Sequence, residues 1–304
     1  MKNIFTAACI FCFSMSVFAQ KTAVPDTALP VKWEELTAPD FIKAVQKSGK
    51  VCIIPWGIME KHGPHLPLGT DLIVIRDISV AAAKQNYAVV FPEFYTGQID
   101  VARPQPGTIA YSPDLVWKML EETCDEIARN GFDKIIIANG HGGNISLLNY
   151  FAQTRLHESK PYSLYYSNVM GVEDSAKKAQ LDKIFEKMPA NAAGGHAGTE
   201  ETSIVMAMRP ELVKTNVIKT ESGENLDRLK ALTMTATGID WYAKFPNHYS
   251  GDAQYSTKEL GMMIRDAMIA DMVKRIQQVK ADQKVKELQQ QFYPATQLPL
   301  NTKQ

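Results

Sequence analysis

Three things are scarce in this 304-residue sequence: an excess of basic charge, cysteine, and repeated or low-complexity segments. Its 33 lysines and arginines are balanced by 33 aspartates and glutamates, so the formal net charge is zero. General binders of nucleic acid or of anionic membranes need a basic excess, so the balance argues against both kinds of partner. The sequence shows no internal repeat, which argues against a solenoid or another repeat architecture.

The longest apolar stretch lies at the N-terminus, and it is short for a membrane-spanning helix. Lys2 precedes a nearly continuous apolar run over residues 4–18, and Val17-Phe18-Ala19 fits a small-x-small cleavage site. This pattern is typical of a secretory signal peptide. We therefore predict a signal peptide over residues 1–19, cleavage after Ala19, a periplasmic or secreted mature protein and no membrane attachment after cleavage.

Cleavage would also remove two of the four cysteines and leave Cys52 and Cys124. Cys52 lies in an apolar strand-like segment, and Cys124 lies on the apolar face of a predicted helix. Both positions are typical of small core residues rather than of a disulfide. The mature protein must then be stabilised by a hydrophobic core.

Beyond a lead-in at residues 20–32, strand and helix patterns alternate, which predicts one α/β domain with a mainly parallel sheet flanked by helices. We place this domain at residues 33–285 and expect a C-terminal tail at residues 286–304 that is loose after Phe292. The predicted strands are 51–55, 88–91, 134–138 and 162–166. The predicted helices are 40–47, 72–85, 113–130, 145–158, 173–189 and a long, methionine-rich one opened by a capping box at residues 256–259.

The loop after the first predicted strand carries a dense set of possible metal ligands. Residues 53–71 read IIPWGIMEKHGPHLPLGTD and place Glu60, His62, His65 and Asp71 in a proline-stiffened segment. Carboxylates and imidazoles are the side chains that hold divalent ions such as zinc, manganese or iron(II). We interpret His65, next to Pro64, as a supporting residue that orients a ligand.

Two later turns add further candidates. His141 follows the strand 134–138 within Asn-Gly-His-Gly-Gly-Asn, and His196 precedes Glu200 and Glu201. The carboxyl ends of parallel strands meet at one edge of a sheet, so these side chains can converge on the first loop. A phosphate cradle around His141 is disfavoured because the lysine and the Ser/Thr pair of such loops are missing.

Other polar residues receive more ordinary interpretations. We interpret His157 and His248 as surface or loop histidines and Glu200 as a solvated neighbour of Glu201, although the sequence does not decide between the two glutamates. The methionines of the C-terminal helix are interpreted as core packing.

Three ordered motifs resemble the creatininase (creatinine amidohydrolase) family. Residues 60–71, EKHGPHLPLGTD, are similar to its signature, and residues 139–144 and 196–203 are similar to its second and third motifs. Weaker similarity occurs at residues 106–108, at Gly251-Asp252 and at residues 259–261. The resemblance spans most of the chain from Trp33 to about Ile269.

The resemblance implies a three-layer α/β/α fold and an amidohydrolase with two divalent ions, zinc, manganese or iron(II). By position, Glu60, Asp71 and His141 would hold one ion, and His62 and Asp71 the other. A water activated by both ions would attack a carbonyl carbon, and His196 would carry the proton to the leaving nitrogen. The family also implies a homo-oligomer, often a hexamer.

One position departs from creatininase itself, whose second motif has a glutamate two residues after the histidine that serves the second ion. Gly143 stands there in this sequence, and Glu201 is our candidate for the missing carboxylate, as metal ligand and catalytic residue. Creatininase also uses tryptophans between the second and third motifs to stack its substrate, but residues 145–193 contain none. Trp241 is a tryptophan that could reach the site from the later loop.

We therefore predict hydrolysis of the C–N bond in a small or cyclic amide or formamide, with creatinine possible but not favoured. Two alternatives stay open at this point: a periplasmic protein of the same fold that binds a metal or small ligand without catalysis, and a metal-dependent esterase or phosphatase. Lys61 is the one basic residue near the motifs, which disfavours a phosphate substrate.

Overall fold

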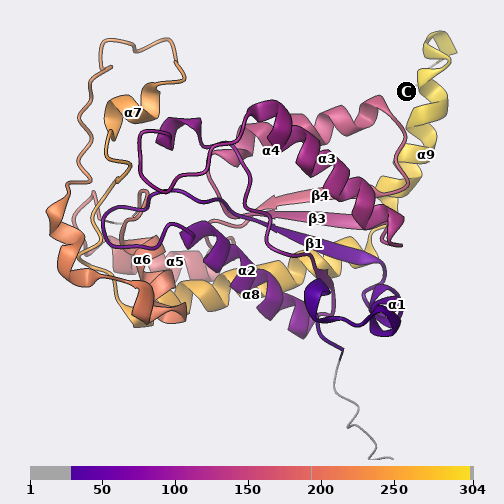
Figure 1. Cartoon of the computed structure of the whole chain (residues 1–304), viewed down its shortest axis with the longest axis horizontal. Coiled ribbons are helices and arrows are strands. Elements are labelled where there is room, and N and C mark those ends of the chain that lie inside the picture. The colour runs from indigo at the N-terminus through magenta and orange to yellow at the C-terminus, as the bar shows by residue number, and fades with distance from the viewer. Residues whose placement is uncertain (1–28, 193, 302–304) are drawn as a thin grey trace, which may run out of the picture.

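A four-stranded sheet lies at the centre of the computed structural model, which describes residues 29–192 and 194–301 (Figure 1). The strand order is β2-β1-β3-β4 and every pairing is parallel. The strands are β1 (Val51–Trp56), β2 (Val89–Val90), β3 (Lys134–Asn139) and β4 (Ser163–Asn168). The predicted signal peptide and its cleavage site lie outside the described residues.

Helices cover both faces of this sheet. Their bounds are α1 (Ala38–Lys47), α2 (Thr70–Gln85), α3 (Pro113–Arg129), α4 (Asn144–Thr154), α5 (Ser175–Phe185), α6 (Thr199–Met208), α7 (Asp240–Lys244), α8 (Lys258–Ala281) and α9 (Lys284–Thr296). Short 3-10 helices lie at Trp33–Glu35, Asp100–Ala102, Arg155–His157, Pro210–Leu212, Thr215–Thr220 and Pro299–Asn301. Within the described residues, no helix has the length and apolar character needed to cross a membrane.

Two apolar cores hold the layers together. Alternate side chains of a strand point to opposite faces of the sheet, and β1 follows this rule with residues that are buried on both sides. Val51 and Ile53 pack in the core with α2 and α8, whereas Cys52 and Ile54 pack with α1, α3 and α4. The predicted three-layer α/β/α fold is confirmed, and Cys52 and Cys124 are buried free thiols as predicted.

The chain connections create a topological switch between the two central strands. From β1 the chain passes through α2 to β2, whereas from β3 it passes through α4 to β4 on the other side. Because α2 and α4 lie on opposite faces, a crevice opens beyond the carboxyl ends of β1 and β3. Ligands bind at such switch points in open α/β sheets. Trp56 and Asn139, the last residues of the two strands, are paired in register, so their following loops start side by side.

Several local predictions need correction. The side-chain cap of α8 is Thr257, whose hydroxyl accepts from the Leu260 N–H at 3.1 Å, whereas Ser256 donates to the Thr199 carbonyl, so no box starts at Ser256. Helix α9 continues past Phe292 to Thr296, where a loose tail was expected. The first two methionines of the α8 stripe, Met262 and Met263, are exposed rather than packed in the core.

Residues 221–250 form a segment that we call the arm. It carries α7 and reaches away from the sheet at the upper left of Figure 1 before returning to α8. Within the arm, Arg228 Nε donates to the Ala243 carbonyl at 2.7 Å. Gln105 Nε2, outside the arm, donates to the Pro246 carbonyl at 2.8 Å. The returning part of the arm brings its side chains toward the switch point.

Candidate metal centre

The loop after β1 and the first turn of α2 bring two carboxylates together. Gly57 follows β1 directly, and a Cβ at this position would meet the Leu72 backbone nitrogen at 2.6 Å. Only a residue without a side chain allows α2 to begin so close to the strand end. Asp71 in the first turn of α2 therefore lies beside Glu60, and the N-terminal end of the helix favours its negative charge.

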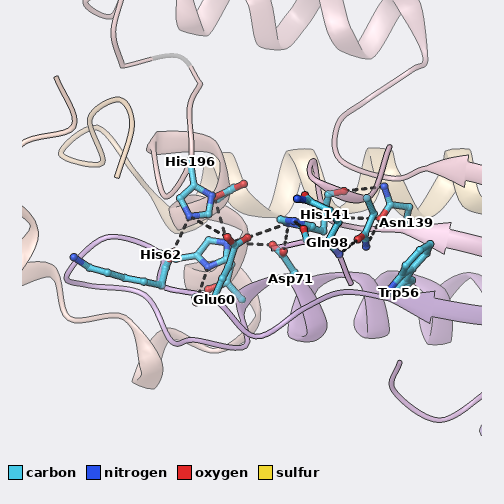
Figure 2. A network of polar contacts seen from close by, with 12 residues as sticks. Trp56, Glu60, His62, Asp71, Gln98, Asn139, His141 and His196 are labelled. Atoms are coloured by element: carbon cyan, nitrogen blue, oxygen red, sulfur yellow. Dashed lines mark hydrogen bonds and ion pairs between the residues drawn. The ribbon is translucent and has the colours of Figure 1, made fainter. Parts of the chain in front are cut away.

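A network of amides fixes His141 at the end of β3. Asn139 Nδ2 donates to the His141 carbonyl at 2.9 Å, and Asn139 Oδ1 accepts from the His141 N–H at 3.2 Å. Asn144 donates to the same Asn139 oxygen and accepts from the Gln98 N–H at 2.9 Å. This network holds the Gln98 carbonyl 3.0 Å from His141 Nε2, so that the histidine ring has one orientation (Figure 2).

Glu60, Asp71 and His141, which we call the first cluster, converge on one point. His141 Nδ1 lies 3.0 Å from Glu60 Oε1 and 3.0 Å from Asp71 Oδ2. Because a carbonyl only accepts, Nε2 carries the proton that binds Gln98, and Nδ1 of the neutral ring is a lone pair. The two carboxylate oxygens are buried and have no hydrogen-bond partner. Three converging lone pairs fit a divalent cation and would otherwise carry a desolvation penalty.

His62, Asp71 and Glu201, which we call the second cluster, lie beside the first, and His196 is also close enough to His62 and Glu201 to share an ion with them. His62 Nδ1 faces the Glu60 carbonyl at 3.3 Å, which leaves Nε2 of the neutral ring as a lone pair. That nitrogen lies 3.1 Å from Asp71 Oδ1 and 3.9 Å from Glu201 Oε2. Asp71 thus presents one oxygen to each cluster, the arrangement expected of a carboxylate that bridges two ions.

The pKa values of His62 and His141 show how strongly the carboxylates of the two clusters attract positive charge. Burial alone would lower the pKa of the His62 imidazole, but Asp71 and Glu60 outweigh it and raise the pKa to about 10. His141 behaves in the same way: burial opposes protonation, and the carboxylates raise its pKa to about 10. In the metal-free protein each ring therefore takes up a second proton, which an incoming cation displaces.

His196 lies over His62, with ring centroids 4.2 Å apart. Its Nε2 donates to the Lys61 carbonyl at 2.8 Å, so Nδ1 is the free nitrogen (Figure 2). Burial, reinforced by the neighbouring His62, lowers the pKa of His196 to about 3. The ring is therefore neutral near pH 7 and able to accept a proton.

The first turn of α6 places Glu201. Ala197 has a left-handed backbone with φ of 60°, a conformation that costs a residue with a side chain about 1–2 kcal/mol. In this conformation its N–H donates to Glu201 Oε2 at 2.6 Å. Burial is the main cause that raises the pKa of Glu201 to about 7, against the attraction of His62.

His65 is buried, and its hydrogen bond is to Thr202 rather than to a candidate ligand. His65 Nε2 lies 2.8 Å from the Thr202 hydroxyl, which donates to the Ala197 carbonyl. This contact joins the loop of the first motif to helix α6 of the third. Burial lowers the pKa of His65 to about 4, so the ring stays neutral.

Glu200 is half-buried, burial raises its pKa to about 7, and it belongs to none of the possible ligand groups among the described residues. His248, interpreted as a surface or loop histidine, does lie in a loop, but it is 3% exposed, and its Nε2 lies 2.5 Å from Glu60 Oε2. Its position three residues before Gly251-Asp252, where a weak motif similarity occurs, was the available signal in the sequence.

A cavity of about 540 Å³ opens over both clusters. Its walls are largely apolar, from Ile99, Val101, Met170 and Trp241, and the ring of Trp241 lies edge-on to His196 at 5.9 Å. The arm thus brings a tryptophan to the site, as the sequence had left open. Within the described residues, no lysine or arginine lines this cavity.

The structure explains why glycine occupies position 143. A Cβ there would lie 2.4 Å from His141 Nε2 and 2.6 Å from the Gln98 carbonyl oxygen. The hydrogen bond that orients His141 passes through the space that a side chain would need. A glutamate cannot enter the second cluster from this position without displacing Gln98, and Glu201 is the carboxylate that faces His62 instead.

The chain is similar to known proteins along most of its length. The family model described as creatinine amidohydrolase (creatininase) matches residues 34–276. A mycofactocin precursor peptide peptidase of Mycobacterium ulcerans (strain Agy99) is 26% identical over 235 residues, 74% of this chain and 83% of the relative. A creatinine amidohydrolase of Pseudomonas putida is 24% identical over 189 residues, 59% of this chain and 72% of the relative.

The fold is also similar to that of solved structures. One of them, named "Creatininase Mn", superposes with a TM-score of 0.69 at 19% identity and covers 83% of this chain and 99% of its own.

Proposed function

This chain belongs to the creatininase family, and from that premise we propose that it is a hydrolase that uses two divalent ions to cleave the C–N bond of a small or cyclic amide or formamide. The observation that carries the proposal is the pair of clusters joined by Asp71. Its Oδ2 faces His141 at 3.0 Å and its Oδ1 faces His62 at 3.1 Å. One carboxylate thus serves two groups of buried lone pairs.

Glu60, Asp71 and His141 would hold one ion, and His62, Asp71 and Glu201 the other. Zinc, manganese or iron(II) all suit this mixture of imidazole and carboxylate ligands. The solved relative with Mn supports a metal of this class. When bound, such ions supply Lewis acidity, which lowers the pKa of a water and polarises a carbonyl oxygen.

The chain's own residues would then bind the substrate and move its proton. His196 lines the cavity, is neutral near pH 7 and has Nδ1 free, so it can take a proton from the attacking water and pass it to the leaving nitrogen. The Lys61 carbonyl keeps the ring in the tautomer that this task requires. We also assign a catalytic role to Glu201, whose carboxylate lies beside His62, in addition to its role as a metal ligand.

The cavity walls support an uncharged substrate over a phosphate ester. Away from the two clusters the walls carry the apolar side chains of Ile99, Val101, Met170 and Trp241, and no lysine or arginine among the described residues lines the cavity. Lys61, the basic residue nearest the motifs, is bound to Glu221 at 2.6 Å. We keep creatinine as a possible but not favoured substrate, because a single tryptophan, Trp241, lines the site.

A peptide amide is a second candidate for the substrate. It is supported by the 26% identity over 235 residues to a protein named a peptide peptidase. We further propose that the mature protein is exported and forms a homo-oligomer, in line with the predicted signal peptide and the family.

The test combines metal analysis with a substrate screen of the purified mature protein. We expect two divalent ions per chain and hydrolysis of members of a panel of cyclic amides, formamides and short peptides that stops when a chelator removes the ions. Activity that survives the chelator would contradict the metal mechanism. Binding of ions without turnover of any amide would favour a binding protein without catalysis. Turnover of phosphate esters alone would favour a metal-dependent phosphatase.

A matched pair of variants tests the ligand assigned to the second ion. Glu201→Gln should reduce the bound metal from two ions per chain toward one, because the carboxylate facing His62 is lost. Glu200→Gln, in the same helical turn, should keep both ions. Two ions bound to Glu201→Gln would show that another group completes the second cluster.

A further inference from the structure

We propose that a hydrogen-bonded chain from Trp241 through His248 positions the Glu60 carboxylate for metal binding. His248 and Trp241 belong to the arm, outside the three motifs, and neither had been assigned a role by its sequence pattern. The inference rests on the proposed function in one respect: it takes Glu60 as a ligand of the first cluster. It assigns to His248 a positioning role and not a place among the ligands.

The direction of each hydrogen bond follows from the chemistry of its members. The indole nitrogen of Trp241 can only donate, and it lies 2.9 Å from His248 Nδ1. Nδ1 must therefore be the acceptor, and the proton of the neutral ring is on Nε2. That nitrogen lies 2.5 Å from Glu60 Oε2, so His248 donates to the carboxylate. Trp241 thus selects the tautomer that Glu60 needs.

The same reasoning excludes His248 as a metal ligand. Glu60, His196 and His248 are close enough together to form a third possible ligand group. To bind an ion through Nε2, His248 would have to carry its proton on Nδ1. Two N–H donors, that of Nδ1 and that of the Trp241 indole, would then face each other without an acceptor. The indole therefore keeps Nε2 protonated and directs it to Glu60.

The bond to His248 divides the two oxygens of Glu60 between two tasks. Oε2 accepts from His248, whereas Oε1 is buried without a hydrogen-bond partner and lies 3.0 Å from His141 Nδ1. A carboxylate that is 1% exposed and held at one oxygen has little freedom to turn its other oxygen away. Residues that orient a ligand in this way commonly change metal affinity about 10–100-fold when they are removed.

The backbone at His248 is held in an unfavourable conformation. Its φ is 56°, in the left-handed region, which is strained for a residue with a side chain. The turn is closed by the His248 N–H, which donates to the Phe245 carbonyl at 3.0 Å. This conformation places the imidazole between the indole and the carboxylate, so the arm determines the orientation of a ligand that the β1 loop supplies.

The experiment measures metal affinity by competition with a chelator, without any substrate. His248→Ala should bind the ion of the first cluster, which Glu60 would hold, about 10–100-fold less tightly than the unmodified protein. His248→Gln should recover most of the loss, because its amide supplies an N–H donor at a similar reach. Both replacements face the same left-handed backbone, so their difference isolates the side chain.

A second pair of variants tests the indole. Trp241→Phe keeps an aromatic ring but removes the N–H that fixes the His248 tautomer, and it should weaken metal binding by a smaller factor than His248→Ala. Trp117→Phe is the matched control, because the indole of Trp117, on α3, packs against Phe151 of α4 and makes no hydrogen bond among the described residues. It should leave metal affinity unchanged.

The outcomes separate this inference from the proposed function. Unchanged affinity in His248→Ala, or equal losses in the Ala and Gln variants, would overturn the positioning role. Loss of a whole ion from every His248 variant, Gln included, would identify His248 as a ligand and overturn it as well. An unmodified protein that binds no divalent ion would overturn both proposals, whereas two bound ions with no amide turnover would leave only the positioning role standing.

Discussion

The sheet edge and the arm contribute to the same site, but they are held in place by different means. The candidate ligands Glu60 and His141 at the sheet edge follow β1 and β3, whose backbones are paired and whose side chains pack in two apolar cores. Trp241 and His248 lie on the arm, whose outgoing and returning parts are joined by hydrogen bonds such as that from Arg228 to the Ala243 carbonyl. The packed core therefore fixes the positions of the candidate ligands, whereas the arm, through His248, orients the carboxylate of one of them, Glu60.

The largest effect should follow from breaking the sheet edge at Asp71. Asp71→Asn removes the charge that faces both clusters, so we expect both ions to bind poorly. Activity should fall by more than the roughly 100-fold that marks the upper end for residues that only orient a ligand. Metal analysis and turnover measure the result. Asp77→Asn is the control: Asp77 also lies on α2 but is paired with Arg265, so this variant should retain both ions. Two ions bound to Asp71→Asn would show that Asp71 does not bridge the two metal sites.

A pH dependence of metal-induced stabilisation should follow next. The pKa of His62 and of His141 is raised to about 10 in the metal-free fold, above the ordinary value of 6.5. Their protonation therefore stabilises the metal-free protein fully below about pH 6.5, and this contribution is lost as the pH rises toward 10. Ions must displace these protons, so they bind more tightly as the pH rises.

Thermal unfolding with and without added ions measures this effect. The increase in Tm caused by the metal should be larger at about pH 8 than at about pH 6. Asp71→Asn, which lacks the bridging charge, should show little increase at either pH. A metal-induced increase that shrinks as the pH rises would contradict the displacement of protons from the two histidines.

An intermediate effect is expected at Gly143. Gly143→Ala places a Cβ against His141 and the Gln98 carbonyl, and overpacking of this kind costs about 1–3 kcal/mol. Gly142→Ala is the matched control, since nothing lies within 4 Å of its Cβ. The free energy of unfolding of the two variants gives the comparison. Equal stability of the two would mean that the Gln98 loop yields easily and that the second motif tolerates a side chain.

The smallest effect should come from loosening the arm. Arg228→Ala removes the hydrogen bonds to the carbonyls of Ala243 and Tyr242, each worth about 0.5–1.5 kcal/mol. We expect faster amide hydrogen exchange in the arm, slightly weaker metal binding and an unchanged core. Arg129→Ala, an exposed ion-pair variant on α3, should change none of these. A large drop in Tm for Arg228→Ala would show that the arm is part of the core rather than an addition to it.

Much of the fold was accessible from the sequence because its pattern is local. The apolar run at β1 and the helical stripe of α3 each reflect burial within one element, and both were predicted close to their observed bounds. The start of α8 was misplaced because Ser256 and Thr257 are chemically similar, and only the tertiary contact of Ser256 with Thr199 decides between them. The end of α9 was missed because its sequence is polar.

The candidate site likewise has features that the sequence predicts and features that only the tertiary structure shows. Sequence alone determined the types of the candidate ligands, from Glu60 to Glu201, and the places of Glu60 and His141 after β1 and β3. The expectation that His196 and Glu201 also follow a strand was wrong, because their segment lies between α5 and α6. Only the tertiary structure decided that Glu201 faces His62, that Gly143 has no room for a side chain, and that His248 is buried against Glu60. These three arrangements depend on contacts between residues that are far apart in the chain, such as Glu60 and His248. No local sequence pattern predicts such contacts. The physical reason is that packing selects the tautomer and orientation of a side chain, whereas sequence specifies only its chemistry.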